Sequence, residues 1–391
     1  MTEALIGPPH LRSRRALAFS AAAAEGRFAL QACSNCNHVT YPPREVCPEC
    51  WSLDLHWKDM SDGGELITET TLRTSFNDYF QERLPWRIGT VKLDVGPTVL
   101  AHVHGDVAEY GRVRMIARTD KSGQGVLMAL PDKETADMAD DRQLRELTCD
   151  PKSRRVLVTD GRTEPGKLMA KALLEAGAST VFVGNVEGGD ELAKVPGVEA
   201  MPLDITDTSS VSRLAGEIGE KTDILINTAE YIRPGSTLER SGMQTARDEM
   251  ETNYFGLMRL IQAFGPGMRA RGVDGDACAW VNLLSVYALC NWPTYGTTSA
   301  SQAAAYSLSQ CLRGEFASFG VKVVNVLYGP LEESRPQAAP QRLADAVVHA
   351  LQQGIEHVSL GAVAEDVVRR FKEDPFVLER ELTQVGSGQD S

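Results

Sequence analysis

Residues 33–50 read CSNCNHVTYPPREVCPEC and contain four cysteines in the spacing C-x2-C-x10-C-x2-C. Each C-x-x-C pair is typical of a tight turn whose two sulfurs face one centre, and two such turns complete a tetrahedral shell of thiolates. We therefore predict a zinc ion bound by Cys33, Cys36, Cys47 and Cys50. Four protein ligands leave no coordination position open, so the predicted role of this zinc is structural.

The alternatives to a metal site are four unrelated thiols or two redox pairs. The neighbouring residues favour the metal site, because Tyr-Pro-Pro-Arg at 41–44 and Trp51 are typical of the hairpins of a zinc ribbon. The other four cysteines show no pairing pattern, which agrees with a reducing compartment, and we expect a cytoplasmic protein. These cysteines are Cys149, Cys278, Cys290 and Cys311.

Length and composition limit the possible classes of protein. A chain of 391 residues, 42% hydrophobic and 24% charged, exceeds one ordinary core and predicts two or three globular domains. Its net charge of −13 argues against binding to a nucleic-acid backbone. No apolar run approaches the roughly 20 residues of a membrane span, and the apolar stretch 21–24 is too short for a signal peptide.

Sequence patterns divide the chain into four parts. Residues 1–57 predict an N-terminal helix followed by a rubredoxin-like zinc ribbon. Residues 58–132 contain short strands separated by tight turns, which predict a small antiparallel barrel of the OB type. The polar stretch 133–154 is typical of a linker. In residues 155–391, β-branched runs alternate with helical segments, which predicts an α/β domain with a doubly wound parallel sheet of the Rossmann type.

The first two of these parts together resemble a known family. The segment EGRFALQAC at 25–33, the four cysteines and the strands that follow are similar to the zinc-ribbon/OB-fold acyl-CoA-associated proteins, over about residues 1–132. The resemblance implies a small subunit that docks on a thiolase- or aldolase-like catalytic chain and completes an acyl-CoA site. An OB barrel also occurs in proteins that bind single-stranded nucleic acid, but the acidic charge and the lack of an Arg/Lys-aromatic strand face argue against that ligand.

Residues 155–391 resemble the short-chain dehydrogenase/reductase family but depart from it in the cofactor loop. That family has Thr-Gly-x-x-x-Gly-x-Gly, whose backbone amides bind the cofactor pyrophosphate at a helix N-terminus. The corresponding run 159–166 reads TDGRTEPG, so Asp160 and Glu164 replace two glycines. Each added carboxylate repels the pyrophosphate by roughly 3 kcal/mol at ~5 Å and an effective dielectric of ~20, which Arg162 offsets in part.

Two more cofactor segments differ from the family. Its Asn-Asn-Ala-Gly stretch appears as Asn-Thr-Ala-Glu at 227–230, and its nicotinamide loop reads Tyr-Gly-Pro at 328–330 instead of starting with Pro-Gly. Asp204 does match the adenine-contacting aspartate of the family, but one retained contact does not make a dinucleotide site. We therefore expect structural zinc as the cofactor and no intact NAD(P) site.

Catalysis in this family uses Asn, Ser, Tyr and Lys, and the lysine lowers the pKa of the tyrosine that transfers the proton. The run SQAA at 301–304 places Thr298 in the tyrosine position and Gln302 in the lysine position. A rival register through Tyr295 puts Ser299 at the lysine position, and the chain has no lysine at 222–321.

Ser285 and Asn253 match the other two family positions, and we interpret them as structural remnants. A threonine hydroxyl is far less acidic than a phenol, and glutamine brings no charge to assist it. The resemblances together imply a non-catalytic accessory subunit of an acyl-CoA-processing complex of the β-oxidation type. Its expected partners are a thiolase- or aldolase-like subunit and acyl-CoA. Helices near 241–265 and 297–318 imply a homodimer, or a heterodimer with an active short-chain dehydrogenase.

The alternative is an active NAD(P)-dependent oxidoreductase that acts on hydroxyacyl- or ketoacyl-CoA, with Tyr295 or Tyr287 as an atypical proton donor. Two smaller groups are also candidates. His102 and His104 alternate along a predicted strand, but no third ligand is evident, which favours packing over a metal site. An aromatic group between the first two barrel strands either covers the core or contacts a partner or acyl chain. It consists of Phe76, Tyr79, Phe80 and Trp86.

Overall fold

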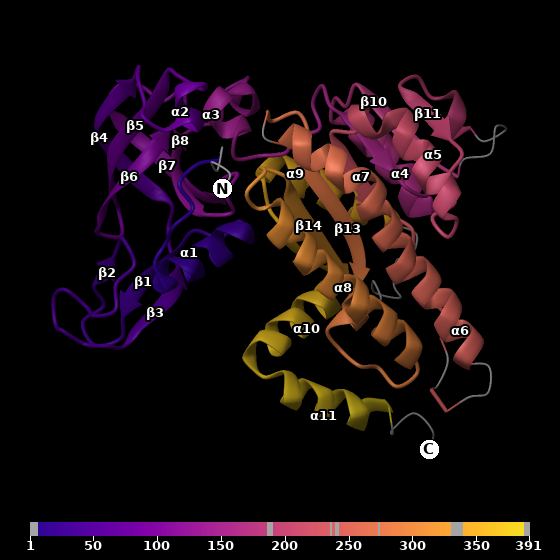
Figure 1. Ribbon diagram of the computed structural model, residues 1–391. Coiled ribbons are helices and arrows are strands. Elements are labelled where there is room, and N and C mark those ends of the chain that lie inside the picture. Colours follow the sequence, from indigo (N-terminus) through magenta and orange to yellow (C-terminus); the bar gives the residue numbers. More distant parts are fainter. Residues whose placement is uncertain are drawn as a thin grey trace, which may run out of the picture. The chain divides into compact units, whose positions relative to one another are not determined.

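The computed structural model describes residues 7–185, 191–234, 237–238, 242–272, 274–329 and 339–386. These residues form two compact units (Figure 1). The first unit comprises Met1–Asp150 with the short segments Ala317–Gly320 and Leu351–Glu356, and the second unit contains the remainder. No helix in the described part of the chain is long and apolar enough to cross a lipid bilayer.

The first unit begins with a helix and a small antiparallel sheet. Ser13 caps the helix by accepting a hydrogen bond from the backbone N–H of Ala16. The sheet has the strand order β2-β1-β3, and its central strand leads directly into the first cysteine of the ribbon. The elements are α1 (Arg14–Ala24), β1 (Ala29–Cys33), β2 (Val39–Thr40) and β3 (Leu55–Asp59).

Five further strands close into the predicted barrel, in the order β4-β5-β6-β8-β7. The barrel core contains fully buried side chains such as Val91 and Val103. Helix α1 packs against β7 and β8. Gly125 allows this close approach, because a Cβ there would lie 2.7 Å from the ring of Phe19. The strands are β4 (Gly63–Leu72), β5 (Trp86–Leu93), β6 (Thr98–Val103), β7 (Gly111–Thr119) and β8 (Gly125–Pro131).

The stretch 133–154, which the sequence pattern presents as a linker, packs against the barrel over part of its length. It contains a 3-10 turn at Met138–Asp140 and the short helix α3 (Arg142–Arg145). The side chain of Gln143 pairs with β5, because its amide accepts from the backbone N–H of Arg87 at 2.8 Å and donates to the Arg87 carbonyl at 2.9 Å. The Gln143 side chain thus makes the two backbone hydrogen bonds that a neighbouring strand would otherwise make to Arg87. A count of polar residues does not reveal such a contact.

The second unit contains a parallel sheet of seven strands in the order β11-β10-β9-β12-β13-β14-β15, which confirms the predicted doubly wound fold. The strand order reverses between β9 and β12, and ligands of such sheets bind at this switch point. The strands are β9 (Arg155–Val158), β10 (Thr180–Gly184), β11 (Val198–Met201), β12 (Ile224–Asn227), β13 (Ala279–Ser285), β14 (Lys322–Tyr328) and β15 (His357–Leu360).

Helices cover this sheet (Figure 1). The core between the helices and the sheet includes Leu214, Phe264 and Leu312. A π-helical segment, Met250–Gly256, connects α6 to α7 and carries Asn253. The α-helices are α4 (Glu164–Glu175), α5 (Thr208–Ile218), α6 (Gly242–Glu249), α7 (Leu257–Gly272), α8 (Gly296–Phe316), α9 (Ala339–Gln353), α10 (Ala362–Glu373) and α11 (Pro375–Gly386). In the first unit, α2 (Asp78–Gln81) precedes β5.

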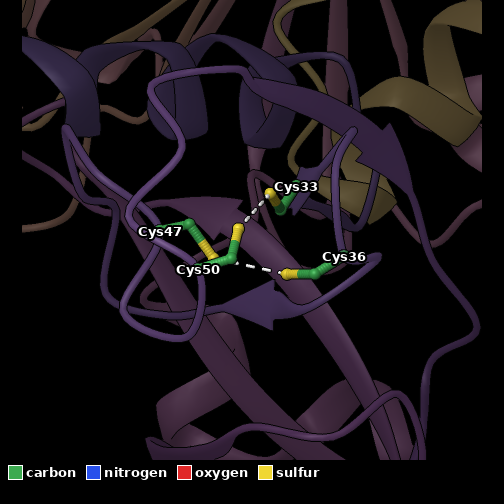
Figure 2. Close-up of side chains that lie close together, drawn as sticks. All are labelled: Cys33, Cys36, Cys47 and Cys50. Atoms are coloured by element: carbon green, nitrogen blue, oxygen red, sulfur yellow. Dashed lines mark hydrogen bonds between the residues drawn. The ribbon is translucent and has the colours of Figure 1, made fainter.

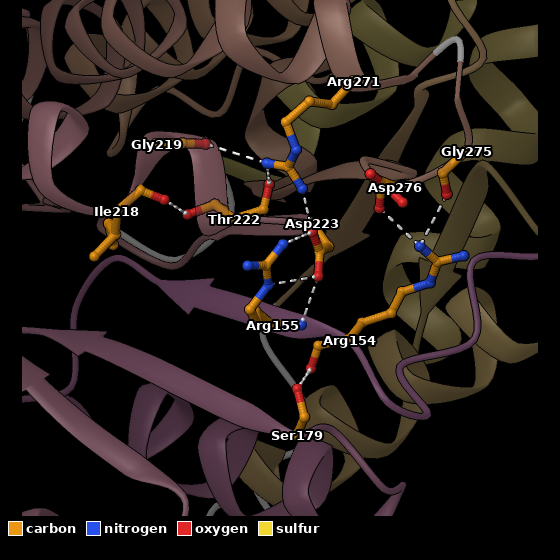
Figure 3. A network of polar contacts seen from close by, with 10 residues as sticks. All are labelled: Arg154, Arg155, Ser179, Ile218, Gly219, Thr222, Asp223, Arg271, Gly275 and Asp276. Atoms are coloured by element: carbon orange, nitrogen blue, oxygen red, sulfur yellow. Dashed lines mark hydrogen bonds and ion pairs between the residues drawn. The ribbon is translucent and has the colours of Figure 1, made fainter.

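An ionic network joins the N-terminal ends of β9 and β12 (Figure 3). The carboxylate of Asp223, only 9% exposed, accepts from the backbone N–H of Arg155 at 2.9 Å and from its guanidinium at 2.9 Å. The guanidinium of Arg271, at the end of α7, also donates to Asp223. One buried carboxylate therefore links two strands and a helix of the second unit.

We predict that Asp223→Ala lowers the free energy of unfolding by about 3 kcal/mol, because it leaves two guanidinium groups without their buried partner. Urea denaturation followed by far-UV circular dichroism measures this change. Asp366 offers a matched control, since it also pairs with two arginines but is exposed at the surface of α10. Asp366→Ala should cost less than about 1 kcal/mol. Equal costs for the two variants would contradict the prediction.

Candidate functional site

The two C-x-x-C turns of the ribbon have the same backbone geometry. Four residues after the first cysteine of each pair, Asn37 and Trp51 have positive φ angles of 59° and 60°. The backbone N–H of Asn37 donates to the carbonyl of Cys33 at 2.9 Å, and that of Trp51 donates to the carbonyl of Cys47 at 3.1 Å. Each turn thereby directs its two thiols to the same side.

The four sulfurs converge on one point (Figure 2). All of them lie within 4.8 Å of one another, with 3.5 Å between Cys33 and Cys50 and 3.6 Å between Cys36 and Cys47. A tetrahedral zinc with Zn–S bonds of ~2.3 Å requires sulfurs roughly 3.8 Å apart, so the arrangement fits zinc. In the described residues this is the one group of metal-ligating side chains that meets these criteria.

The two histidines singled out in the sequence form internal hydrogen bonds, as the packing interpretation predicts. His102 Nδ1 accepts from the indole N–H of Trp86 at 2.8 Å. His104 Nε2 lies 2.9 Å from the carbonyl of Met138, and its Nδ1 accepts from the backbone N–H of Asp106.

The aromatic group between β4 and β5 divides between the two expected roles. Tyr79 and Trp86 are buried, and Phe80 lies edge-on against both rings. Phe76 is fully exposed. The ribbon adds two exposed apolar side chains that sequence reasoning did not identify as a surface, Trp51 (80% exposed) and Leu53 (76% exposed). Their position directly after the last cysteine was the available signal.

In the second unit, the loop that follows β9 at the switch point forms hydrogen bonds to a carboxylate of its own, that of Asp160. Asp160 accepts from the backbone N–H of Arg162 at 2.9 Å and from the Arg162 guanidinium at 2.7 Å. That carboxylate is 7% exposed, so it is turned into the loop. Gly166 is the retained glycine, and a Cβ there would lie 1.9 Å from the carbonyl oxygen of Asp160. The glycine at position 166 therefore still allows the loop to pack closely against the start of α4. One backbone N–H of the loop, that of Arg162, already bonds to the Asp160 side chain.

Asp204 lies in the turn between β11 and α5 and is exposed. Hydrogen bonds from the hydroxyl and backbone N–H of Thr206 lower the pKa of its carboxyl. The nearby guanidinium groups of Arg162 and Arg259 lower it further. This side chain therefore remains ionised and accessible in the turn after β11.

Thr298, at the family's tyrosine position, is buried and donates to the carboxylate of Glu249. Glu249 is fully buried, and the same oxygen accepts from the backbone N–H of Arg233 at 3.0 Å. Its second oxygen has no hydrogen-bond partner in the described part of the chain. The hydroxyl that replaces the phenol is thus held by an internal carboxylate.

Gln302, at the lysine position, joins a second group of buried polar side chains. Its amide donates to Glu230 at 3.1 Å and accepts from the backbone N–H of Ser285 at 3.0 Å. The hydroxyl of Tyr328 donates to the other oxygen of Glu230. Burial raises the pKa of Glu230 to about 7, although the bond from Tyr328 lowers it. This cluster therefore joins three segments that bind cofactor or act in catalysis in the family: the stretch 227–230, the lysine position on α8 and the loop that begins at Tyr328.

The two retained family residues also have internal partners. The hydroxyl of Ser285 accepts from the backbone N–H of Tyr287 at 3.3 Å. The amide of Asn253 exchanges two hydrogen bonds with the backbone of Tyr231 and donates to Ser301 at 2.9 Å. These contacts fix the loop after β12 against α8.

The tyrosines of the alternative mechanism stack on each other. The rings of Tyr287 and Tyr295 are 4.6 Å apart and nearly parallel. Burial raises the pKa of Tyr287 to about 12, so its phenol is a weaker acid than usual. Residues of α10 and α11, such as Val367 and Leu378, pack in the same apolar cluster.

Sequence reasoning missed the part played by Glu230 and Glu249. Glu230 stood in the altered Asn-Thr-Ala-Glu stretch, but its partners come from two other elements. Glu249 precedes the family asparagine by four residues, and an acidic side chain on the inner face of that helix was the available signal.

Comparisons with known proteins agree with this division into parts. The short chain dehydrogenase family model matches residues 154–341. The rubredoxin-like zinc ribbon domain of ChsH2 matches residues 20–56, and the C-terminal OB-fold domain of ChsH2 matches residues 57–116. An uncharacterized oxidoreductase of Mycobacterium tuberculosis is 28% identical over 266 residues, which cover 61% of this chain and 75% of that protein.

Two solved structures are similar to the chain in sequence and fold. A short chain dehydrogenase from Burkholderia cenocepacia, crystallised in complex with NADP, is 30% identical with a TM-score of 0.53 and covers 60% of this chain and 98% of its own. A short-chain dehydrogenase from Streptomyces avermitilis is 26% identical with a TM-score of 0.51 and covers 61% of this chain and 100% of its own. The second unit therefore contains a short-chain dehydrogenase domain, and the first unit contains a zinc ribbon and an OB-fold of the ChsH2 type.

Proposed function

We propose that this protein is a non-catalytic accessory subunit of an acyl-CoA-processing complex, in which the zinc ribbon and barrel dock on a thiolase- or aldolase-like chain. The dehydrogenase-like unit then serves assembly. The combination of ChsH2-type domains with a short-chain dehydrogenase domain supports an acyl-CoA-related fusion protein. The non-catalytic role is inferred from the side chains at the family's catalytic positions.

The observation that carries the proposal is the hydrogen bonding of Thr298 and Gln302. Thr298 bonds to Glu249, and Gln302 bonds to Glu230, so both side chains are engaged by acidic residues of this chain. A proton-transfer pair needs an acidic phenol and a cation that lowers its pKa. A threonine beside a carboxylate supplies neither, because nearby negative charge makes a hydroxyl harder to ionise.

The cofactor loop supports the same proposal. Backbone N–H groups at a helix N-terminus bind phosphate best when they are free to point at the anion. Here the Arg162 N–H already donates to the Asp160 carboxylate. A pyrophosphate would have to displace that carboxylate and then lie beside it, which adds electrostatic repulsion to the loss of the bond.

Exposed apolar side chains on the first unit support a docking surface. Trp51, Leu53 and Phe76 are all largely exposed, and large apolar side chains of this kind are frequent anchors of protein interfaces. In the second unit, Met243 on α6 and Phe255 in the π-helical segment are also exposed, on the first of the helices expected to pair with another dehydrogenase chain.

A second candidate is an active NAD(P)-dependent oxidoreductase on hydroxyacyl- or ketoacyl-CoA. The observation that favours it is the likeness to proteins named oxidoreductases and to a dehydrogenase crystallised with NADP. Its proton donor would be Tyr295 or Tyr287, and the high pKa of Tyr287 counts against that residue.

We predict one zinc per chain, and Cys47→Ala should lose the zinc and unfold the ribbon, because metal binding supplies folding energy in such sites. Elemental analysis and circular dichroism of freshly purified protein measure the two effects. Cys311→Ala, which removes an exposed cysteine outside the site, should keep full zinc content. Less than half an equivalent of zinc in the unmodified, unchelated protein would refute the site.

We predict that the unmodified chain does not oxidise hydroxyacyl-CoA or reduce ketoacyl-CoA, and that Thr298→Tyr combined with Gln302→Lys stays inactive. The restored pair would still meet Glu249 and Glu230, and the loop at Asp160 would remain altered. Absorbance at 340 nm with either dinucleotide is the readout, with an active short-chain dehydrogenase assayed alongside. Turnover by the unmodified chain would establish the oxidoreductase candidate instead.

We predict that tagged full-length protein captures a thiolase- or aldolase-like chain from its own host, and that Trp51→Asn with Leu53→Ser weakens this capture at least tenfold. Asparagine tolerates the positive φ at position 51, so the ribbon should keep its zinc. Tyr110→Ala, another exposed aromatic change on the first unit, is the control. A protein that stays alone in these experiments would rule out the accessory-subunit proposal.

A further inference from the structure

A cavity of about 350 Å³ lies within the first unit, and its lining contains none of the four ribbon cysteines. Its walls come from the helix α1, the turn at 41–43 and three barrel strands, β5, β6 and β8. Most of the lining is apolar, including Phe19, Pro42, Ile88 and Leu127. Its volume lies near the lower end of the range for small-molecule sites.

Besides the Ser20 hydroxyl, which donates to the carbonyl of Ala16, two neutral side chains in this lining carry a donor, the phenol of Tyr41 and the imidazole of His102. His102 lines the cavity, and its Nδ1 accepts from Trp86 at 2.8 Å. Burial lowers the pKa of His102 to about 4, so the ring is neutral near pH 7. Since Nδ1 is an acceptor, the ring proton lies on Nε2. No other hydrogen bond of this ring occurs in the described part of the chain.

The rim of the cavity differs from its interior. Leu100 and Arg12 belong to the lining and are exposed to solvent. The guanidinium of Arg12 is held at the surface by hydrogen bonds to the carbonyls of Pro9 and Leu11. A ligand would therefore meet a positive charge outside, apolar walls inside, and neutral donors at the imidazole of His102 and the phenol of Tyr41.

We propose that this cavity binds a small apolar ligand group that carries a neutral carbonyl, with the carbonyl oxygen accepting from Nε2 of His102. A carboxylate in that position would lose its hydration without a compensating charge, because the neutral imidazole supplies one hydrogen bond only. Ketones and thioesters satisfy the same requirement. The choice of a thioester as the natural ligand rests on the proposed function, but the cavity and its donor do not.

The test is calorimetric titration of the zinc-loaded full chain with 2-octanone, with the S-octanoyl thioester of N-acetylcysteamine and with octanoate. The two carbonyl compounds should bind, and octanoate should bind at least tenfold more weakly. His102→Phe should weaken carbonyl binding about three- to tenfold through loss of one hydrogen bond, and His102→Gln, which keeps a donor, should restore it.

Neighbouring positions on α1 supply a matched pair of variants. Ala16 lines the cavity, so Ala16→Trp should fill it and abolish binding of both carbonyl probes. Leu17, the next residue, is exposed and outside the lining, and Leu17→Trp should leave binding unchanged. Undiminished binding by Ala16→Trp, or no binding by the unmodified chain, would overturn the cavity proposal. Binding without capture of a partner chain would overturn the accessory-subunit proposal alone.

Discussion

Buried polar groups must find partners inside the protein, and this constraint determines both candidate sites. The four thiols of the ribbon meet at distances that only a metal ion satisfies well, since Cys33 and Cys47 are fully buried. In the second unit no cation takes the lysine position, and the partly buried carboxylate of Glu230 and the fully buried carboxylate of Glu249 bond to the side chains and backbone around them. The same requirement thus predicts a bound ion in one unit and a self-contained hydrogen-bond cluster in the other.

The two units suggest a division of labour in the proposed complex. The ribbon holds Trp51 and Leu53 at its surface because the turn that positions Cys50 also fixes the backbone that follows it. The dehydrogenase-like sheet keeps its stability through contacts far from the switch point, such as the network around Asp223. Under the accessory-subunit proposal, the different side chains at the family's catalytic positions, Thr298 and Gln302, would therefore leave the fold intact for assembly.

Much of this arrangement could be predicted from the sequence, because it depends on local spacing. Two cysteines with two residues between them readily share one turn, and the alternating strand and helix patterns predicted the parallel sheet that the structure confirms. The partners of Glu230 were not predictable in this way, since Gln302 lies 72 residues and Tyr328 98 residues further along the chain. Gln143 was missed for a similar reason, because its partner Arg87 is distant in sequence and the bond uses backbone atoms.

We propose that the dehydrogenase-like unit has no working dinucleotide site, because Asp160 takes a backbone donor of the cofactor loop and Thr298 and Gln302 bond to carboxylates of the chain itself. Calorimetric titration of the unmodified full-length protein with NADH and with NADPH measures whether such a site exists. We expect no binding heat up to about 1 mM of either dinucleotide, which corresponds to a binding free energy weaker than about −4 kcal/mol. A dissociation constant in the micromolar range for either one would contradict it.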